Sequence, residues 1–264
     1  MIKEMKMGEE IKRSDSGYVT TILFNRPEKR NALNADALFA IGELARDVER
    51  EKSARALVLR GEGDKVFCSG VDLSAGASDF ERTIEGLDYC LTGLLECSCP
   101  IISMIYGPAI GAGLDIAVIS DFRIAEERAK FGAPLVRLGR TYYYTAIGRL
   151  TRLIGLSPAK EILLTGRLID SQRAWQIGLI NNVVSHDELE STTAEFARDL
   201  AEEAAPLAVS VTKQTIRKIF EEQPIDSVIE EELRRLADSA NQSSDAEEGV
   251  MAMLEKRKPL FTGK

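Results

Sequence analysis

The sequence predicts an α/β fold in which a core of strand–helix–strand units is followed by a helical C-terminal region. Two observations carry this prediction. In the first half of the chain, short runs of β-branched and aromatic residues alternate with segments in which apolar residues recur at the spacing of an α-helix. After about residue 144, helical segments follow one another without a long linker. The 264 residues are enough for one domain, or for one domain with an appendage.

The individual elements follow from local patterns. Strands are expected in apolar runs that polar or glycine-containing turns bound, at residues 18–24, 56–60, 66–68, 101–106 and 122–125. Helices are expected between and after them, at residues 34–50, 79–95, 112–119, 159–164, 171–176, 187–203, 207–222, 225–240 and 245–256. Asn34 is the expected N-cap of the first helix, and Trp175 is expected in the core.

Composition and charge exclude several classes of function. The net charge of −8 makes the chain a poor candidate for nucleic-acid binding, which draws on basic surface. No segment approaches the roughly 20 apolar residues that span a membrane, and the acidic N-terminus does not resemble a signal peptide. Four cysteines without a CxxC pair, beside one histidine, argue against zinc. We therefore expect a cytoplasmic protein with free thiols and no metal.

The single histidine limits the chemistry. His186 lies in a polar stretch before a predicted helix, where an exposed position is expected. Catalysis by Ser–His–Asp or Cys–His then lacks its base. Acid–base work would fall to carboxylates, tyrosines, lysines or water.

Two segments, residues 67–73 and 106–115, share one local plan: an apolar strand, then small residues, then the start of a helix. Glycines at such positions let the backbone approach a ligand closely, and a helix N-terminus points unpaired N–H groups towards it. Two such groups together would stabilise a developing oxyanion. Either segment alone is equally consistent with an ordinary tight turn.

Several segments together resemble the crotonase (enoyl-CoA hydratase/isomerase) superfamily. They occur in the family's order and spacing, cover nearly the whole chain, and are residues 25–33, 67–73, 107–125, 129–134 and 255–261. The resemblance implies a spiral of ββα units with an acyl-CoA site in residues 1–200. It also implies a helical region, residues 201–264, that mediates assembly into a homotrimer or a dimer of trimers.

The resemblance also implies a set of site residues. The thioester oxygen of a bent acyl-CoA would lie between the backbone N–H groups of Val71 and Ala112. Coenzyme A would be part of the substrate, so no separate cofactor is expected. The implied coenzyme A contacts are Lys29 and Arg30 near the phosphates, Lys256 and Phe261 near the adenine, and Ala32 and Gly70.

The catalytic side chains depart from the hydratase pattern of two glutamates around a water. Asp115 stands at the first position and can still act as acid or base, although it reaches about 1 Å less far. Leu135 stands at the second position and cannot transfer a proton. Tyr142 resembles a tyrosine of the methylmalonyl-CoA decarboxylase branch and is a candidate catalytic residue; packing of a lid or trimer contact is the equal alternative.

We therefore expect enoyl-CoA hydratase/isomerase-type chemistry through an enolate, with Asp115 moving the proton and Tyr142 assisting. One alternative is decarboxylation of a malonyl-type CoA, which needs an oxyanion hole but no base for a C–H proton. The other alternative is a non-catalytic acyl-CoA-binding homologue, which Leu135 favours and the carboxylate of Asp115 opposes.

Overall fold

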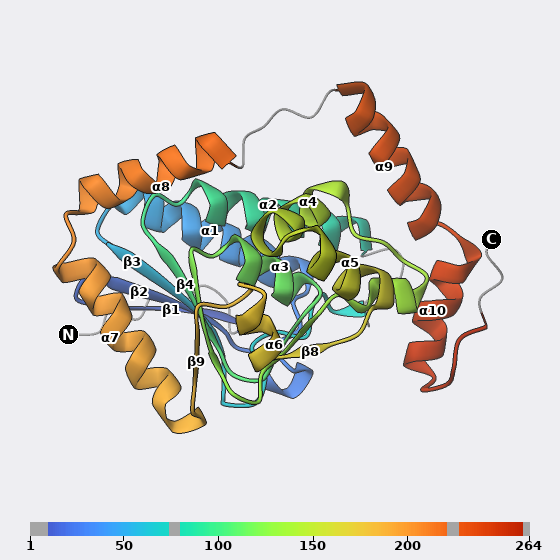
Figure 1. Ribbon diagram of the computed structural model, residues 1–264, viewed down its shortest axis with the longest axis horizontal. Helices are drawn as coiled ribbons and strands as arrows, with labels where there is room; N and C mark the ends of the chain where they lie inside the picture. Colours follow the sequence, from blue (N-terminus) through green and yellow to red (C-terminus); the bar gives the residue numbers. More distant parts are fainter. Residues whose placement is uncertain (1–9, 74–79, 221–226, 261–264) are drawn as a thin grey trace.

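A six-stranded sheet forms the centre of the molecule (Figure 1). The computed structural model describes residues 10–73, 80–220 and 227–260. The strand order is β1-β2-β3-β4-β6-β9, and only β1 runs antiparallel to its neighbour. The strands are β1 (Ile11–Ser16), β2 (Val19–Phe24), β3 (Ala56–Gly61), β4 (Ile101–Ile105), β6 (Phe122–Glu126) and β9 (Asn182–Val184).

Helices cover both faces of this sheet, as its continuous apolar strands require. Side chains alternate along β3, so Leu57 and Leu59 belong to the main core, which contains α1 (Ala35–Glu51) and α2 (Phe80–Glu96). The intervening residues of β3 face the other way and pack with α7 (Leu189–Glu202). The predicted N-cap is confirmed, since the Asn34 side chain accepts a hydrogen bond from the Ala37 N–H.

A second, three-stranded sheet lies beside the first and carries the connections that build the site. It has the order β5-β7-β8, with β5 (Pro108–Ile110), β7 (Lys130–Gly132) and β8 (Ile169–Asp170). Directly after β5 comes α3 (Ala112–Ile119), a buried helix whose bounds match the prediction. The 3₁₀ helix η4 (Pro134–Leu138) follows β7 and leads to α4 (Tyr144–Ile154), α5 (Leu156–Thr165) and α6 (Ser171–Gln176).

The C-terminal region is helical, as predicted. It contains α8 (Pro206–Phe220), α9 (Ser227–Asn241) and α10 (Ser244–Leu254). In Figure 1, α7 and α8 lie towards one end of the molecule, while α9 and α10 lie at the other. Helix α9 contacts α4, and α10 contacts η4. The Thr141 N–H donates to Asn241 Oδ1 (2.9 Å), and Tyr144 Oη donates to Glu230 (2.7 Å), so α9 bonds directly to the core. None of the described helices is both long and apolar enough to cross a membrane.

The predicted strand at residues 66–68 is wrong. The Val66 carbonyl accepts from the Asn31 side chain (2.7 Å), and Cys68 forms only an isolated bridge to Ala109. The backbone of this segment therefore bonds to the Asn31 side chain and, through Cys68 alone, to residues 108–110, so no ladder with a neighbouring strand forms. The short strands β5, β7, β8 and β9 were not predicted, because two or three residues carry too little pattern.

Two single-residue predictions also differ from the structure. Trp175 is 55% exposed, because the short α6 turns Ser171 and Ala174 inwards and leaves the tryptophan outside. His186 is half-buried rather than exposed: its Nδ1 lies 2.7 Å from Glu126 Oε2, and its ring packs on Tyr106. It does not line the cavity described below.

Candidate active site

A cavity of about 520 Å³ lies between the two turns identified in the sequence, α2, α4 and α9. Its size suits a small organic group. Six residues singled out from the sequence line it together: Gly70, Val71, Ala112, Asp115, Leu135 and Tyr142. The described residues contain no group of three His, Cys, Asp or Glu side chains placed to hold a metal ion.

The two glycine-containing turns lie side by side at one wall of the cavity. The Ile110 N–H donates to the Cys68 carbonyl (2.9 Å), which ties one turn to the other. A Cβ atom on Gly70 would lie 3.1 Å from the Ile110 oxygen and 3.7 Å from the Ala112 nitrogen. A Cβ on Gly113 would lie only 2.5 Å from the Cys68 oxygen. Glycine is therefore what allows the two backbones to approach this closely.

The backbone bonds around Val71 and Ala112 leave the N–H groups of both residues without an acceptor in the described structure. Leu33 pairs with this turn through bonds to the residues on either side of Val71: its N–H donates to the Gly70 carbonyl (2.9 Å), and its carbonyl accepts from the Asp72 N–H (2.8 Å). Ala112 is the first residue of α3, where an N–H has no partner within the helix. Within the described parts of the chain, neither group donates a backbone hydrogen bond.

Asp115 lies one turn into α3 and is 6% exposed. Burial raises the pKa of its carboxyl to about 6, and the Arg149 guanidinium opposes part of this rise. The nearest guanidinium nitrogen, Arg149 Nη2, is 3.9 Å from Asp115 Oδ1, beyond hydrogen-bond distance. The result is a carboxyl group that exchanges its proton near pH 6, where a general acid or base is useful.

Tyr142 is packed against the core with a hydroxyl that has no hydrogen-bond partner among the described residues. This oxygen lies 3.9 Å from the position that a Cβ on Gly111 would occupy. Burial, and then the charge of Asp115, raise the pKa of the phenol well above its usual range. The hydroxyl is therefore neutral, and its proton is available for a hydrogen bond beside the turn that contains Gly111.

No second carboxylate stands beside Asp115 in the described structure. Leu135, on η4, occupies the wall where the resemblance led us to expect one. The other carboxylates lining the cavity are exposed side chains, namely Glu85, Asp88 and Asp238. None of them contributes to the pKa of Asp115. The site holds one buried acid, not two.

The residues expected to contact coenzyme A are more scattered. Lys29 and Arg30 are exposed around the 3₁₀ helix η1 (Pro27–Lys29), and the Arg30 carbonyl accepts from the Ser69 N–H (3.2 Å). Ala32, which follows this loop in the chain, is buried. Lys256 is exposed after α10 and does not line the cavity, and Phe261 lies outside the described residues.

The two lining arginines that are not exposed, Arg140 and Arg149, were not assigned from the sequence. A signal for Arg149 was available, because it lies on α4 next to the face formed by Ala146 and Leu150. A cation beside an apolar helical face indicates a buried partner. The partner, Asp115, is 34 residues away and follows only from the tertiary fold.

Comparison with known proteins gives a consistent family. The family model described as enoyl-CoA hydratase/isomerase matches residues 14–264. A short-chain-enoyl-CoA hydratase of Clostridium acetobutylicum is 34% identical over 250 residues, which are 92% of this chain and 93% of the relative.

Solved structures agree. A methylmalonyl-CoA decarboxylase complexed with 2S-carboxypropyl-CoA superposes with a TM-score of 0.89 at 32% identity, covering 98% of this chain and all of that one. An enoyl-CoA hydratase/carnithine racemase from Magnetospirillum magneticum gives a TM-score of 0.78 at 29% identity, covering 99% and 97%. The α/β crotonase fold expected from the sequence is confirmed, and the chain belongs to the enoyl-CoA hydratase/isomerase family.

Proposed function

We propose that this protein is an acyl-CoA enzyme that forms a thioester enolate, with Asp115 as its one buried proton carrier. The observation that carries the proposal is a single buried carboxyl among the described lining residues, in the same cavity as two backbone N–H groups that have no acceptor in the described chain. Val71 and Ala112 would donate to the thioester oxygen. Prealigned donors of this kind are worth on the order of 3 kcal/mol each in the transition state.

The arrangement fits movement of a double bond better than addition of water. In the ionised form, Asp115 would remove a proton from Cα of a 3-enoyl thioester, and the electron pair would pass to the thioester oxygen. The same carboxyl would then return the proton to Cγ, which gives the 2-enoyl thioester. Hydration needs a second group to position and deprotonate water, and Leu135 cannot serve.

The remaining contacts follow the family resemblance. Lys29 and Arg30 would meet the phosphates of coenzyme A, Ala32 and Gly70 the chain leading to the thioester, and Lys256 and Phe261 the adenine end. Coenzyme A is part of the substrate, so the reaction needs no separate cofactor. A cytoplasmic location stays part of the proposal.

Three substrates separate the possible reactions. Purified protein is incubated with a 3-enoyl-CoA, with crotonyl-CoA and with methylmalonyl-CoA. Appearance of the conjugated thioester absorbance with the first substrate supports isomerisation, and its loss with the second supports hydration. Tight binding of all three without turnover would contradict the proposal in favour of a non-catalytic binder.

Decarboxylation is the second candidate. The methylmalonyl-CoA decarboxylase structure gives a higher TM-score than the hydratase/racemase structure, 0.89 against 0.78. Cleavage of the C–C bond of a malonyl-type thioester leaves its electrons in the same enolate. This step needs no second base, so it is compatible with a leucine at position 135. Protonated Asp115, or Tyr142, would then deliver a proton to Cα. Release of CO₂ from methylmalonyl-CoA would move this reaction to first place.

The pKa of Asp115 predicts the pH dependence of isomerisation. A raised pKa of about 6 means that the carboxyl stays protonated, and inactive as a base, in weakly acidic solution. We expect kcat/KM to rise about tenfold per pH unit below pH 6 and to level off above it. Initial rates between about pH 5 and pH 8 measure this. A flat profile would contradict the role of Asp115 as the base.

Tyr142→Phe tests the unpaired hydroxyl. Because this oxygen has no partner among the described residues, its removal should leave the melting temperature unchanged or raise it. If the phenol donates to the reacting substrate, kcat should still fall about tenfold or more. Unchanged kcat would assign Tyr142 to packing. A large loss of stability would show that the hydroxyl has a structural partner.

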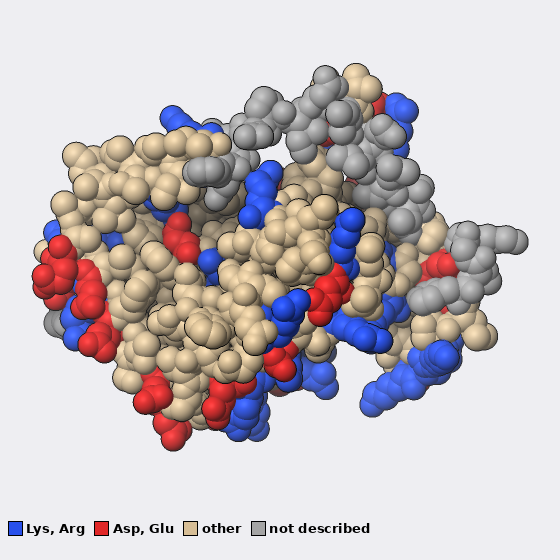
Figure 2. Space-filling model, in the orientation of Figure 1, with Lys and Arg blue, Asp and Glu red and all other residues tan. Residues whose placement is uncertain are grey.

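The homotrimer or dimer of trimers is supported by the surface of α8. Four large apolar side chains of this helix are exposed: Leu207, Val211, Ile216 and Ile219. Uncharged atoms also predominate over α8 in Figure 2. Such a surface is typical of an interface. Light scattering should give three or six times the chain mass of 29.1 kDa, and Val211→Asp should lower that value; a monomeric mass would contradict the assembly.

A further inference from the structure

Arg140 is a cation of the cavity for which the described structure provides no counter-charge. It follows Gly139, which ends η4 in the left-handed conformation, and its own N–H donates to the Leu135 carbonyl (2.9 Å). Its guanidinium lies over the Phe80 ring, 4.2 Å from the centroid. The Nε and Nη1 atoms are buried, and no hydrogen-bond acceptor among the described residues reaches them.

The charges inside the cavity do not balance. Among the described lining residues, the charged side chains that are not exposed are Asp115, Arg140 and Arg149, so two guanidinium groups face one carboxyl. Arg149 is the arginine that forms an ion pair with Asp115. The remaining charged lining residues are exposed, namely Glu85, Asp88, Arg234 and Asp238. A guanidinium with two buried, unpaired nitrogens is costly, so its presence on a cavity wall indicates an anionic ligand group.

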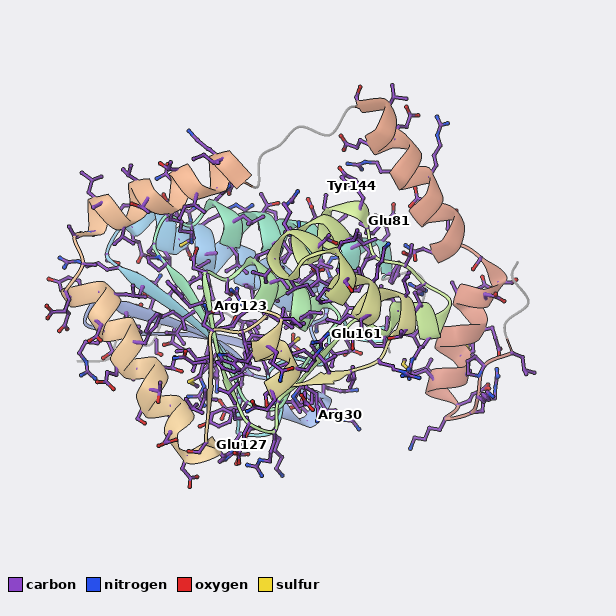
Figure 3. All side chains as sticks on the ribbon, in the orientation of Figure 1. Arg30, Glu81, Arg123, Glu127, Tyr144 and Glu161 are labelled. Carbon is purple, nitrogen blue, oxygen red and sulfur yellow. The ribbon has the colours of Figure 1, made fainter. Side chains whose placement is uncertain are left out.

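Arg140 does not interact with the buried carboxyl of the site. Burial raises the pKa of Asp115 and Arg149 is the charge that opposes this, whereas burial lowers the pKa of Arg140 and the Tyr143 phenol opposes that. In Figure 3, Tyr144, which also lines the cavity, and Arg30, in the loop expected near the coenzyme A phosphates, lie on opposite sides of the molecule. Arg140 is therefore not the partner of Asp115, which leaves its charge for another group of the ligand.

We propose that the acyl group of the substrate ends in a carboxylate that binds Arg140, so that the preferred substrates are thioesters of dicarboxylic acids. This inference rests on the acyl-CoA function proposed above and narrows it. The unpaired Nε and Nη1 donors would form charge-assisted hydrogen bonds with the carboxylate. The carboxylate would be separated from the thioester by several carbons, as in a glutaryl rather than a malonyl chain.

Equilibrium binding of two saturated thioesters of equal chain length tests the inference without turnover by isomerisation or hydration. Calorimetry compares glutaryl-CoA with pentanoyl-CoA in the wild type, in Arg140→Met and in Arg140→Lys. We expect glutaryl-CoA to bind the wild type about 10- to 100-fold more tightly. Arg140→Met should abolish this preference, and Arg140→Lys should keep part of it. The ratio of two affinities in one sample does not depend on the fraction of folded protein.

Arg152→Met is the matched control, since Arg152 is an exposed arginine of α4 that does not line the cavity. It should retain the full preference. Equal binding of both thioesters by the wild type would overturn the carboxylate inference and leave the acyl-CoA function intact. Equal weakening of both thioesters and of free coenzyme A by Arg140→Met would overturn it as well, because Arg140 would then bind coenzyme A itself. Failure of every thioester to bind would overturn the function and the inference together.

Discussion

Asp115→Asn is expected to lower turnover of the acyl-CoA substrate by about 10²- to 10⁴-fold, the usual contribution of a positioned acid or base. Asparagine has the size of aspartate but cannot exchange the proton. The site around it should otherwise persist, since Asp115 accepts no hydrogen bond from a described side chain and loses only the 3.9 Å ion pair with Arg149. Substrate affinity should therefore change little. Single-turnover kinetics with calorimetric binding separate the two quantities.

The same substitution is expected to stabilise the fold near neutral pH. The folded pKa of Asp115, about 6, exceeds the ordinary value of 3.8, so unfolding releases a proton between these values and stability falls as pH rises through that window. Asparagine removes this cost, which is about 3 kcal/mol because the folded pKa of about 6 already contains the opposing effect of Arg149. The gain should be complete above pH 6 and absent below about pH 4. Thermal unfolding at both extremes measures it.

Asp121→Asn is the matched control. Asp121 is a half-buried carboxylate that accepts from the Ile101 N–H and from Lys213 Nζ, both at 2.7 Å. Its replacement should lower stability and spare the chemical step, the opposite of Asp115. A loss of both stability and turnover in Asp115→Asn would instead indicate that Asp115 has a structural role.

Gly70→Ala is expected to lower turnover by about 10²- to 10³-fold, the effect of losing one oxyanion donor. Gly70 has a φ of 104°, which alanine rarely adopts, and its new methyl group would lie 3.1 Å from the Ile110 oxygen. The turn must shift to relieve both constraints, and it carries the Val71 N–H with it. Even a small displacement of a donor from its aligned position is costly to the transition state.

Gly63→Ala separates backbone strain from damage to the site. Gly63 has a φ of 78°, and nothing lies within 4 Å of its added Cβ. Both variants should lose stability, but only Gly70→Ala should lose turnover per folded molecule. Full turnover in Gly70→Ala would contradict the assignment of the Val71 N–H to the oxyanion.

The sequence predicted those parts of the site that depend on local backbone. The bounds of α3 follow from a glycine-rich turn before an apolar segment, and the two turns follow from glycines after apolar runs. Residues whose role depends on distant packing were missed. Arg149 reaches Asp115 only because α4 folds over α3, and the unpaired guanidinium of Arg140 depends on the position of Phe80.

The same distinction between local pattern and distant packing explains which strands were predicted. Long apolar strands such as β3 and β4 were predicted because each carries its own pattern. The strands β5, β7 and β8 exist through pairing with one another, which no local pattern reports. The split into residues 1–200 and 201–264 stays a prediction, and its boundary falls within α7.

Exchange of the α-protons of a bound, saturated thioester tests the central claim most directly. Butyryl-CoA is incubated with the protein in D₂O, and deuterium at Cα is followed by NMR or mass spectrometry. Enolate formation at the Val71 and Ala112 N–H groups, with Asp115 as base, predicts exchange by the wild type. In Asp115→Asn, exchange should be slower than in the wild type by about 10²-fold or more. Tight binding of butyryl-CoA by the wild type without any exchange at Cα would contradict the account.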